Sequence, residues 1–436
     1  MTNDDSLSIL IPAKNEGDSI GSLIVRIQRI VSELTTSAEV LVIDAGSSDD
    51  TCSIALSLGA KVCRQKEPGY GGALRSGFAA ASGQFIITMD ADFSHDPVFL
   101  RSFWAHRHAA DVLIASRYVP GGQSRTGLLR KFLSRLLNAS YRWALSLPIR
   151  DLSSGFRMYC RELVVSPPTQ SIGFEILEEI IIKLYAQGFC IREIPFEYRP
   201  RRYGTSKARL IRFGLSLLKT LFRFWKLRNS LFFCDYDERA YWSRFLPQRY
   251  WQRRRYALVM ELLEAQTIRP TDTILDIGCG CSQIFQDLPG TPIGLDISLP
   301  KLRYLRKSKK GLVNGDLNAL PFRACSVDRM ICSQVIEHMP RADLEELNRV
   351  LKEGGLLVIG TPDYGRPYWP VIEWFYSKII PAGYADEHIN RYTLKRLTGE
   401  LNTAGFLVRE ARYILGAELI VKAVKVRPSR PVQFSG

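Results

Sequence analysis

The first two hundred residues alternate short apolar runs with longer segments that have helical periodicity. Apolar runs at residues 7–11, 39–43, 84–88 and 112–115, several of them rich in β-branched side chains, predict buried strands. The segments between them open on capping residues or glycines and predict helices. This alternation of strand and helix predicts a parallel sheet covered by helices.

The same pattern starts again in the second half of the chain. Residues 273–275, 293–296, 327–333 and 356–360 read as further strands, and a tight glycine turn follows the first of them. The sequence therefore predicts an α/β protein with two Rossmann-like domains, at 1–207 and 251–436. Residues 208–250 are expected to form a basic amphipathic helix and a linker.

Two aspartates, Asp90 and Asp92, directly follow the strand predicted at residues 84–88. Residues i and i+2 of an extended segment project from the same face, and two carboxylates there can hold a hard divalent cation. The strand ends of such a sheet would bring Glu16, Asp44, Asp90 and Asp92 to one rim, where α/β sheets bind ligands. A solvated strand end or a helix cap is the alternative interpretation of the aspartate pair.

The composition indicates a globular protein and argues against membrane-spanning, secreted and disulfide-rich classes. The 436 residues are 46% hydrophobic and 24% charged, which is typical of globular domains, and no apolar run reaches the ~18 residues of a membrane span. The first ten residues lack the features of a signal peptide, and the nine cysteines form no CxxC pair. We therefore expect a cytoplasmic, reduced protein with neither a disulfide framework nor a zinc site.

The net charge of +15 is concentrated between residues 199 and 255, which hold 16 Lys or Arg against three acids. Residues 208–228 predict a helix with Arg209, Arg212, Lys219, Arg223 and Lys226 on one face and Leu, Phe and Trp on the other. Such a helix is typical of a protein lying on the membrane surface. A helix docked between domains is the alternative. Aromatic residues interleave with arginines after it, but nothing downstream supports nucleic-acid binding.

Six blocks in order carry a family resemblance: LSILIPAKNEGDSI, VLVIDAGSSDDT, GYGGALRSGFAAASGQFIITMDADFSHDP, ASRYVPGG, RDLSSGFRMYCREL and YRPRRYGTSK. Residues 5–210 resemble the inverting GT-A glycosyltransferases of the dolichyl-phosphate mannosyltransferase group. The resemblance implies a nucleotide-sugar donor, a polyprenyl phosphate acceptor, and Mg²⁺ or Mn²⁺. Ala45 and Ser94 depart from the family pattern, where a second aspartate and a glutamine are usual.

By matching position, the resemblance implies a donor site that includes the metal ligands Asp90 and Asp92. Its residues would be Pro12, Ala13, Glu16, Asp44, Asp90, Ala91, Asp92, Arg117, Arg201 and Lys207. The acceptor phosphate would meet Arg130, Lys131 and Arg135 in the block RKFLSRLL. A phosphate monoester is already mostly anionic at neutral pH, so no general base is nominated. Glu175, Glu178 and Glu179 are expected to lie on a solvated helix face.

The second half resembles the class I S-adenosylmethionine methyltransferases through ILDIGCG, IGLDIS, VNGDLNALPF, VDRMICSQVIEHMP and LNRVLKEGGLLVIGTP. The resemblance covers residues 250–415. It implies that the cofactor S-adenosylmethionine is bound by Asp276, Gly278, Gly280, Asp296, Asp316 and Leu317. Ser282 replaces the usual third glycine. Glu337 and His338 stand near the expected methyl-acceptor side, with helix capping as an equally good explanation.

These observations predict a bifunctional enzyme on the cytoplasmic face of the membrane. One domain would transfer a sugar from a nucleotide-sugar to a polyprenyl phosphate, and the other would methylate an unknown acceptor. Two alternatives remain open at this point. One is a soluble glycosyltransferase that acts on a polysaccharide or a small glycoside. The other is a non-catalytic membrane-surface protein with a domain that senses S-adenosylmethionine.

Overall fold

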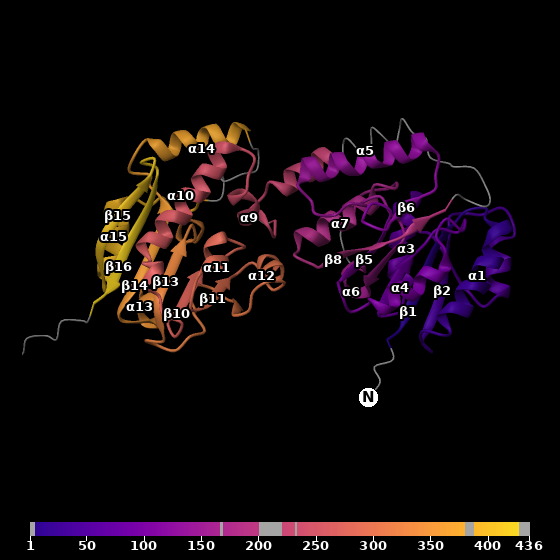
Figure 1. Cartoon of the computed structure of the whole chain (residues 1–436), viewed down its shortest axis with the longest axis horizontal. Coiled ribbons are helices and arrows are strands. Elements are labelled where there is room, and N and C mark those ends of the chain that lie inside the picture. Colours follow the sequence, from indigo (N-terminus) through magenta and orange to yellow (C-terminus); the bar gives the residue numbers. More distant parts are fainter. Residues whose placement is uncertain (1–4, 166–168, 200–219, 232, 380–387, 427–436) are drawn as a thin grey trace, which may run out of the picture. The chain divides into compact units, whose positions relative to one another are not determined.

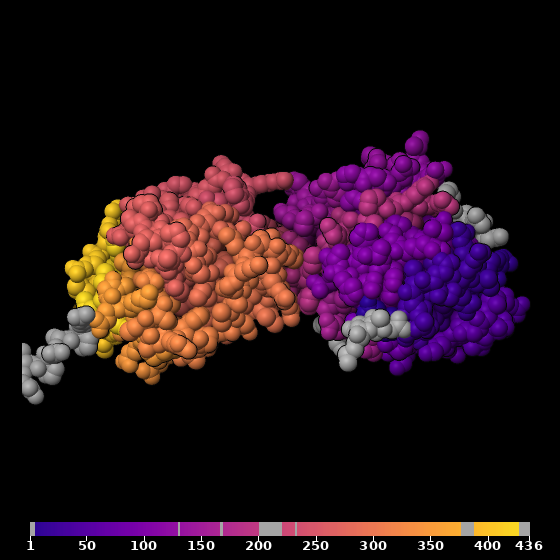
Figure 2. Space-filling view, turned by 60° about the horizontal axis from the view of Figure 1, so that its bottom comes forward, coloured from indigo at the N-terminus to yellow at the C-terminus, as the bar shows by residue number. Residues whose placement is uncertain are grey.

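The computed structural model describes residues 5–165, 169–199, 220–231, 233–379 and 388–426. The chain divides into two units, residues 1–185 with 189–225, and residues 186–188 with 226–436. In Figure 1, the strands of each unit are flanked by helices, and Figure 2 gives the same chain in space-filling form. None of the described helices combines the length and apolarity that crossing a membrane requires.

The first unit is built on a seven-stranded sheet with the order β3-β2-β1-β4-β7-β5-β8. Its elements are β1 (Leu7–Ala13), α1 (Gly17–Val31), β2 (Ala38–Asp44), α2 (Thr51–Ser57), β3 (Lys61–Arg64), α3 (Gly69–Ala80), β4 (Phe85–Thr88), η1 (Pro97–Phe99), α4 (Leu100–Ala105), β5 (Val112–Ser116), β6 (Gln123–Ser124), α5 (Leu128–Leu145), β7 (Arg157–Cys160), α6 (Arg161–Val164), α7 (Ile176–Ala186), β8 (Ile191–Pro195) and β9 (Glu197–Tyr198).

The second unit also holds a seven-stranded sheet, with the order β12-β11-β10-β13-β14-β16-β15. Its elements are α9 (Tyr236–Tyr241), α10 (Leu246–Leu262), η2 (Ala265–Thr267), β10 (Thr273–Ile277), α11 (Gln283–Asp287), β11 (Thr291–Asp296), α12 (Leu299–Leu305), β12 (Leu312–Asn314), β13 (Val327–Ser333), η3 (Ile336–His338), α13 (Leu344–Val350), β14 (Leu351–Pro362), α14 (Tyr368–Ile379), α15 (Leu394–Thr403), β15 (Phe406–Ile414) and β16 (Glu418–Lys425).

The apolar periodicities explain why these elements form. The buried residues of α1, among them Ile20, Leu23, Ile24 and Ile27, recur every three or four positions and pack against the strands of the first sheet. The central strands are apolar on both faces, as expected for strands covered on both sides. The prediction of two Rossmann-like α/β domains is confirmed.

One strand of the first sheet departs from the predicted parallel arrangement. β7 lies between β4 and β5 and runs antiparallel to both. It contains Arg157, which is fully buried and donates hydrogen bonds to the carbonyl oxygens of Leu152 and Leu177. Because a charged residue lies inside this strand, a search for apolar runs does not identify it as buried.

Candidate functional site

The carboxyl ends of β1, β2 and β4 form the rim on which the predicted donor site lies. Ala13 pairs in register with Asp44, while Leu10 pairs with Thr88, two residues before Asp90. Because these three strands are parallel neighbours, their ends meet at one edge of the sheet. The fold therefore brings the predicted residues of these three loops to the same edge.

The loops after β1 and β2 are joined by several hydrogen bonds. The side chain of Asn15 accepts from the backbone N–H of Ser48, and Asp49 accepts from the N–H of Gly17. The N–H of Glu16 donates to the hydroxyl of Thr51. Together these bonds hold the two loops as one wall beside Pro12 and Ala13.

Asp44 is buried at the end of β2, and its carboxylate accepts hydrogen bonds from the N–H groups of Gly46 and Ser47. Burial acts to raise the pKa of Asp44, but the hydrogen bonds from Ser47 and Gly46 outweigh it and lower the pKa. The side chain is thus an ionised acceptor that shapes its own turn.

Asp90 and Asp92 occupy different environments within the loop after β4. The side chain of Asp90 is 29% exposed, whereas Asp92 is buried and accepts from the N–H of Ser94. Ala91 is buried between them. Near Asp90, a Cβ added to Gly155 would lie 3.1 Å from the Tyr70 hydroxyl and 3.9 Å from Asp90 Oδ1. A side chain at 155 would therefore crowd the Tyr70 hydroxyl and approach the Asp90 carboxylate, which glycine avoids.

His95 fixes this loop, and no sequence pattern singles it out. Its Nδ1 accepts a hydrogen bond of 2.9 Å from the Asp90 N–H, so the ring proton sits on Nε2, which lies 3.7 Å from Asp90 Oδ2. The ring is buried and stacks on Phe156 with centroids 4.7 Å apart. His95 stands in the quoted DADFSH block, but only the structure shows that its ring turns back to residue 90.

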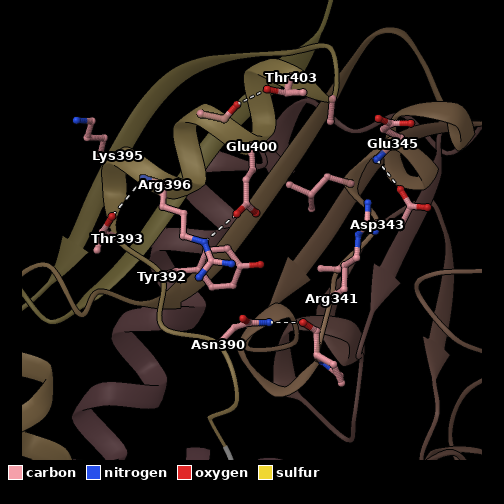
Figure 3. Close-up of a pocket in the computed structure, with 15 residues that line it drawn as sticks. Arg341, Asp343, Glu345, Asn390, Tyr392, Thr393, Lys395, Arg396, Glu400 and Thr403 are labelled. Carbon is pink, nitrogen blue, oxygen red and sulfur yellow. Dashed lines mark hydrogen bonds and ion pairs between the residues drawn. The ribbon is translucent and has the colours of Figure 1, made fainter.

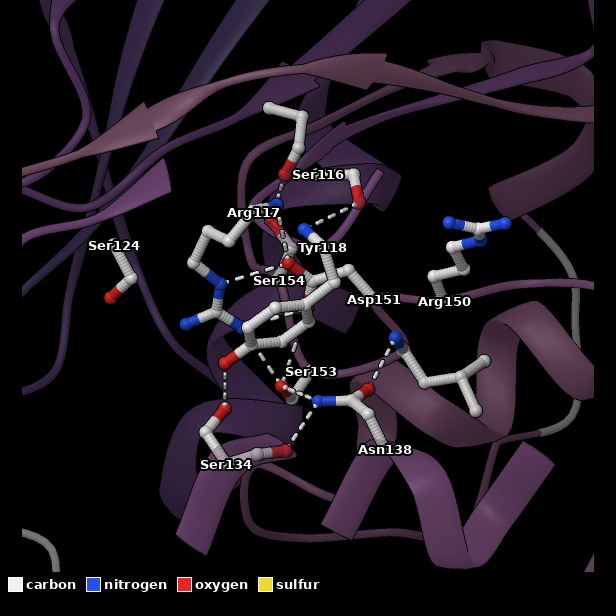
Figure 4. A network of polar contacts seen from close by, with 12 residues as sticks. Ser116, Arg117, Tyr118, Ser124, Ser134, Asn138, Arg150, Asp151, Ser153 and Ser154 are labelled. Atoms are coloured by element: carbon white, nitrogen blue, oxygen red, sulfur yellow. Dashed lines mark hydrogen bonds and ion pairs between the residues drawn. The ribbon is translucent and has the colours of Figure 1, made fainter. Parts of the chain in front are cut away.

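Arg117, predicted to clamp donor phosphates, is held by an acid within the first unit. Its Nε and Nη2 atoms bind the two oxygens of the buried Asp151 at 2.8 and 2.7 Å, and Nη2 also donates to Ser153 (Figure 4). Burial acts to lower the pKa of Arg117, but the Asp151 carboxylate outweighs it and raises the pKa. Asp151 is 34 residues away in sequence, so no local pattern could have identified the pair.

The same network ties α5 to the loop that carries Asp151. Asn138 accepts from the N–H of Leu152 and donates to the Ser153 hydroxyl, and the Tyr118 hydroxyl donates to Ser134 (Figure 4). A cavity of about 530 Å³ opens here. It is lined by Arg117, Tyr118, Val119, Pro120, Gly121, Gly122, Arg135, Asn138, Ala139, Arg142 and Arg150.

We call this cavity the arginine pocket. It has four arginines and no carboxylate in its described lining. Arg117 is neutralised by Asp151, but no ion pair is found for Arg135, Arg142 or Arg150 within the described part of the chain. Of the residues predicted to meet an acceptor phosphate, Arg135 lines the pocket, while Arg130 and Lys131 lie near the start of α5. Arg201 and Lys207 fall outside the described residues.

α5 exposes a set of large apolar side chains beside this pocket. Leu128 is 86% exposed and Trp143 is 73% exposed, and Leu129, Phe132 and Leu136 are also exposed. We call these five side chains the apolar face of α5. Single exposed apolar residues are ordinary, but a group of this size on one helix indicates an interaction surface.

The helix predicted at 208–228 is described only from residue 220 onward. Within this part, Phe224 is buried, and Arg223 lies 3.3 Å from Glu179 and 3.2 Å from the Ser171 hydroxyl. In the described portion, Arg223 thus contacts its own domain and Phe224 is buried, as in the docked alternative, whereas Lys226 is exposed. Phe222 is 60% exposed.

The expectation of a solvated face for Glu178 and Glu179 is wrong, because both side chains are buried. Glu179 accepts from Lys183 and from the N–H groups of Gln170 and Ser171. Burial acts to raise the pKa of Glu179, but these bonds outweigh it and lower the pKa to about 2. For Glu178 burial is the dominant influence, and it raises the pKa to about 8.

In the second unit, the glycine turn predicted to bind S-adenosylmethionine follows β10. Gly278 and Gly280 have φ values of 66° and 51°, a region that favours glycine, and a Cβ on Gly278 would lie 2.2 Å from Val335 Cγ2. Ser282, in place of the usual third glycine, caps α11 by accepting from the N–H of Phe285. The substitution thus gives the helix a side-chain cap.

Asp296 lies at the end of β11 and reaches back to this turn. Its two carboxylate oxygens accept from the N–H groups of Gly280 and Ser298 at 2.8 and 2.7 Å. Asp276, at the neighbouring strand, is buried, and burial raises its pKa well above the usual range, with Asp296 and Asp237 adding to the effect. Asp316 is exposed and Leu317 buried, and both directly follow β12 beside β11.

Asp237 and Lys301 complete this site, and neither was predicted. The carboxylate of Asp237 accepts from the N–H of Cys281 at 3.3 Å and from Lys301 Nζ at 2.9 Å. A Cβ on Gly280 would lie only 2.3 Å from that carboxylate. Asp237 belongs to α9, more than 40 residues before the turn, so the only signal in the sequence is the charge of the α9 acids.

A cavity in the second unit is lined by none of the residues predicted to bind S-adenosylmethionine. It has a volume of about 900 Å³ and lies between α13 and α15 (Figure 3). Its charges are mixed, and Arg396 pairs with Glu400 at 2.8 Å. We assign no ligand to it.

Comparison with known proteins identifies both units. Residues 8–165 match the model described as glycosyl transferase family 2, and residues 275–359 match the model described as a methyltransferase domain. The chain carries a family 2 glycosyltransferase domain followed by a methyltransferase domain. The predicted recognition of both enzyme classes is thereby confirmed.

Two curated relatives match the glycosyltransferase domain. The dolichol-phosphate mannosyltransferase of Pyrococcus furiosus is 35% identical over 213 residues, which cover 46% of this chain and 58% of the relative. The polyprenol monophosphomannose synthase of Mycolicibacterium smegmatis is 28% identical over 240 residues, or 51% of this chain and 88% of the relative. The chain thus spans little more than half the length of the first of these relatives.

Among solved structures, the chain is similar to glucosyl-3-phosphoglycerate synthase from Mycobacterium tuberculosis in complex with Mn²⁺, UDP-glucose and phosphoglyceric acid. The identity is 25%, the TM-score is 0.43, and the match covers 51% of this chain and 80% of that one.

Proposed function

We propose that the glycosyltransferase domain transfers a sugar from a nucleotide-sugar to a polyprenyl phosphate, and that the methyltransferase domain uses S-adenosylmethionine. The observation that carries the first part is the arginine pocket, which lies beside the apolar face of α5. A lipid phosphate needs cations for its headgroup and an apolar surface for its chain. One helix offers both. The curated relatives are named for reactions on such lipids, which agrees with this proposal.

The donor would lie on the rim formed by Pro12, Ala13, Glu16 and Asp44, with its diphosphate toward Asp90 and Asp92. The oxygen atoms of these two carboxylates, of which that of Asp90 is partly exposed, are ligands that a hard cation such as Mg²⁺ or Mn²⁺ prefers. When bound, that cation supplies charge neutralisation for the departing nucleoside diphosphate. His95 holds the Asp90 backbone, so the carboxylate stays in place while the leaving group gains charge.

The acceptor phosphate would occupy the arginine pocket, where Arg135, Arg142 and Arg150 supply the positive charge. Its oxygen forms the new bond to the anomeric carbon, and the bond from that carbon to the diphosphate oxygen breaks. The phosphate oxygen is already ionised near neutral pH, so no side chain has to remove a proton. Arg117, fixed by Asp151, would act as a rigid part of the pocket wall.

The apolar face of α5 would lie on the membrane surface and bring the pocket to the lipid headgroups. This assigns to α5 the peripheral membrane contact that the sequence had suggested for residues 208–228. Leu and Trp side chains at the interface contribute apolar burial, and nearby cations add attraction to anionic lipids.

In the methyltransferase domain, S-adenosylmethionine would lie over the turn of Gly278 and Gly280, with its ribose hydroxyls at Asp296. The cofactor carries a sulfonium and an ammonium group, and it supplies the methyl group. The carboxylates of Asp276, Asp296 and Asp237 gather at the turn, where Lys301 pairs with Asp237. Such an acidic site fits a ligand that carries a sulfonium and an ammonium group beside its own carboxylate.

The test uses the full chain with polyprenyl phosphate in anionic liposomes, a panel of labelled nucleotide-sugars, and Mg²⁺ or Mn²⁺. We expect one labelled lipid by mass spectrometry, lost in EDTA and restored by either metal. Asp90→Asn and Asp92→Asn should abolish transfer, whereas Asp18→Asn, at an exposed acid, should not. Full activity in excess chelator would rule out the metal.

The same experiment separates the alternatives. Label on an added glycoside or polysaccharide, with none on the lipid, would favour the soluble transferase. Binding of donor and S-adenosylmethionine without any product would favour the sensor.

A further inference from the structure

We propose that Glu337, His338 and His388 of the methyltransferase domain form a binding site for a divalent cation of the zinc type. Each residue offers one ligand atom, and the three atoms lie within 4.8 Å of one another. The inference concerns cation binding alone and does not depend on either proposed activity.

The backbone explains why residues 50 apart in sequence come together. The N–H groups of Ile389 and Asn390 both donate to the backbone carbonyl of Glu337, at 2.8 and 3.0 Å. The side-chain amide of Asn390 also donates to the carbonyl of Pro340. The segment that begins at His388 is thus fixed to η3, and the two imidazole rings lie with centroids 5.0 Å apart.

The buried carboxylate of Glu337 would be stabilised by a bound cation. The side chain is 0% exposed, and in the described part of the chain neither carboxylate oxygen has a hydrogen bond of normal geometry, although the Thr361 hydroxyl and the N–H of Glu337 lie close to the group. A nearby cation, Arg255, is bound through Nε and Nη2 to both oxygens of Glu418. Burying a carboxylate without donors is costly, and such groups are normally paired or bound to a metal.

His388 is oriented as a metal ligand. Its side chain is 2% exposed, and its Nδ1 lies 2.8 Å from the Tyr364 hydroxyl and 3.1 Å from Glu373 Oε1. The Tyr364 hydroxyl donates to the same Glu373 oxygen, so the ring proton belongs on Nδ1. This tautomer presents the Nε2 lone pair to a cation, and a histidine backed by a carboxylate is the usual arrangement at metal sites.

The ligand set indicates the class of metal. Two imidazoles and one carboxylate suit Zn²⁺ and its neighbours, whereas Mg²⁺ and Ca²⁺ prefer oxygen ligands alone. Three protein ligands leave one position for water or a substrate atom. No zinc motif is visible in the sequence because the ligands are not spaced as a CxxC or His-x-x-x-His pair.

An apolar cavity of about 220 Å³ adjoins this cluster. It is lined by Trp369, whose ring lies 5.8 Å from that of His388, and by Glu373, which supports His388. Val335, two residues before Glu337, packs closely against the glycine turn at Gly278. The proposed cation site therefore lies near both the turn that would bind the methyl donor and a pocket that can take an apolar molecule.

The test uses the full chain with Asp90→Asn and Asp92→Asn, so that the glycosyltransferase carboxylates do not bind metal. The protein is freed of metal with chelator and titrated with Co²⁺ alone, followed by visible absorption. We expect one equivalent to bind with the absorption of a low-coordinate nitrogen-ligated ion, and Zn²⁺ to displace it. Glu337→Gln, His338→Ala and His388→Ala should each weaken binding by more than tenfold, and Glu373→Gln by about tenfold.

Two controls keep the result interpretable. His106→Ala changes an exposed histidine of the other domain and should leave Co²⁺ affinity within about twofold. Glu337→Gln keeps the size of a buried side chain and removes its charge, so its unchanged melting temperature without metal would exclude misfolding. Unchanged Co²⁺ affinity in the Glu337→Gln and His388→Ala proteins, or the absence of Co²⁺ binding in the parent protein, would overturn the proposal.

Discussion

At the scale of single residues, the two candidate sites depend on how carboxylates are held. Asp90 is held by a histidine that binds its backbone, which leaves the carboxylate itself available. Asp44 and Asp296 instead accept backbone N–H groups at the turns beside them. The hydrogen bonds around each carboxylate thus decide whether it stabilises a backbone turn or remains available to bind a ligand.

His95→Phe tests whether the ring orders the loop. Phenylalanine can keep the stacking on Phe156 but cannot accept from the Asp90 N–H. Loss of one hydrogen bond, worth ~1 kcal/mol, should weaken Mn²⁺ binding to the glycosyltransferase domain roughly fivefold. Free Mn²⁺ measured by electron paramagnetic resonance provides the readout, and His106→Phe is the control. Equal Mn²⁺ affinity in both variants would show that His95 is only a packing residue.

Arg135→Ala tests the arginine pocket. Charged hydrogen bonds to phosphate contribute ~1.5–3 kcal/mol, so the KM for polyprenyl phosphate should rise about tenfold or more. The KM for the nucleotide-sugar should stay within about twofold, because Arg135 lines the pocket that, in our proposal, takes the acceptor phosphate. Arg101→Ala removes a surface arginine paired with Glu33 and serves as the control. Equal increases in the KM for polyprenyl phosphate and the KM for the nucleotide-sugar would mean that Arg135 belongs to the donor site or has only a structural role.

At the scale of elements, α7 carries a buried acid whose burial reduces stability. Glu178 has an unfolded pKa near 4.5 and a folded pKa of about 8, with burial as the main cause. Below pH 4.5 the Glu178 carboxyl is protonated in both the folded and the unfolded chain, so its burial costs no ionisation free energy. Between pH 4.5 and about 8 this carboxyl ionises in the unfolded chain but stays protonated in the folded chain. The free energy of unfolding therefore falls as the pH rises.

Glu178→Gln should therefore stabilise the protein more at pH 8 than at pH 5. The gain at pH 8 should be on the order of 4 kcal/mol, because the pKa rises from 4.5 to about 8 and each unit corresponds to ~1.4 kcal/mol, while Gln keeps the size of the side chain without its charge. Thermal unfolding of both proteins at the two pH values measures it, with Glu175→Gln, at a less buried acid, as the control. A gain that does not depend on pH would contradict the raised pKa.

α9 is a second element with a specific role, because Asp237 lies against the turn proposed to bind S-adenosylmethionine. Asp237→Asn removes the charge that faces Lys301 and, in our proposal, the methionine end of the cofactor. Calorimetric affinity for S-adenosylmethionine should fall about tenfold, as for the loss of a charged hydrogen bond. Asp287→Asn, on α11, is the control. A lower melting temperature with unchanged affinity would mean that Asp237 only fastens α9 to the turn.

The sequence predicted the strand ends well because the signals there are local. An apolar run followed by an acid or a glycine turn identifies the end of a strand, as for Asp90 and Gly278. The residues that were missed act through partners far away in sequence: Asp151 for Arg117, Asp237 for the glycine turn, and His388 for Glu337. Such pairs arise only when the sheet assembles, so no pattern within a short window can reveal them.

At the scale of the whole molecule, two transferase domains share one chain. A linked domain meets the product of its neighbour at an effective concentration that commonly reaches the ~mM range for a short linker. This advantage matters most when the product of one domain is the substrate of the other. A lipid-linked sugar would also stay in the membrane plane, near the apolar face of α5.

We therefore expect the methyltransferase domain to act on the transferred sugar or on a closely coupled lipid intermediate. Methyl-labelled S-adenosylmethionine, nucleotide-sugar and polyprenyl phosphate are supplied together, and the lipid is extracted. Label in the lipid should require the nucleotide-sugar. It should disappear in Asp92→Asn, which we expect to stop sugar transfer, and in Asp296→Ala, which we expect to weaken cofactor binding. Arg101→Ala should leave it unchanged. A protein that methylates another acceptor while the lipid-linked sugar stays unlabelled would show two steps that share no intermediate.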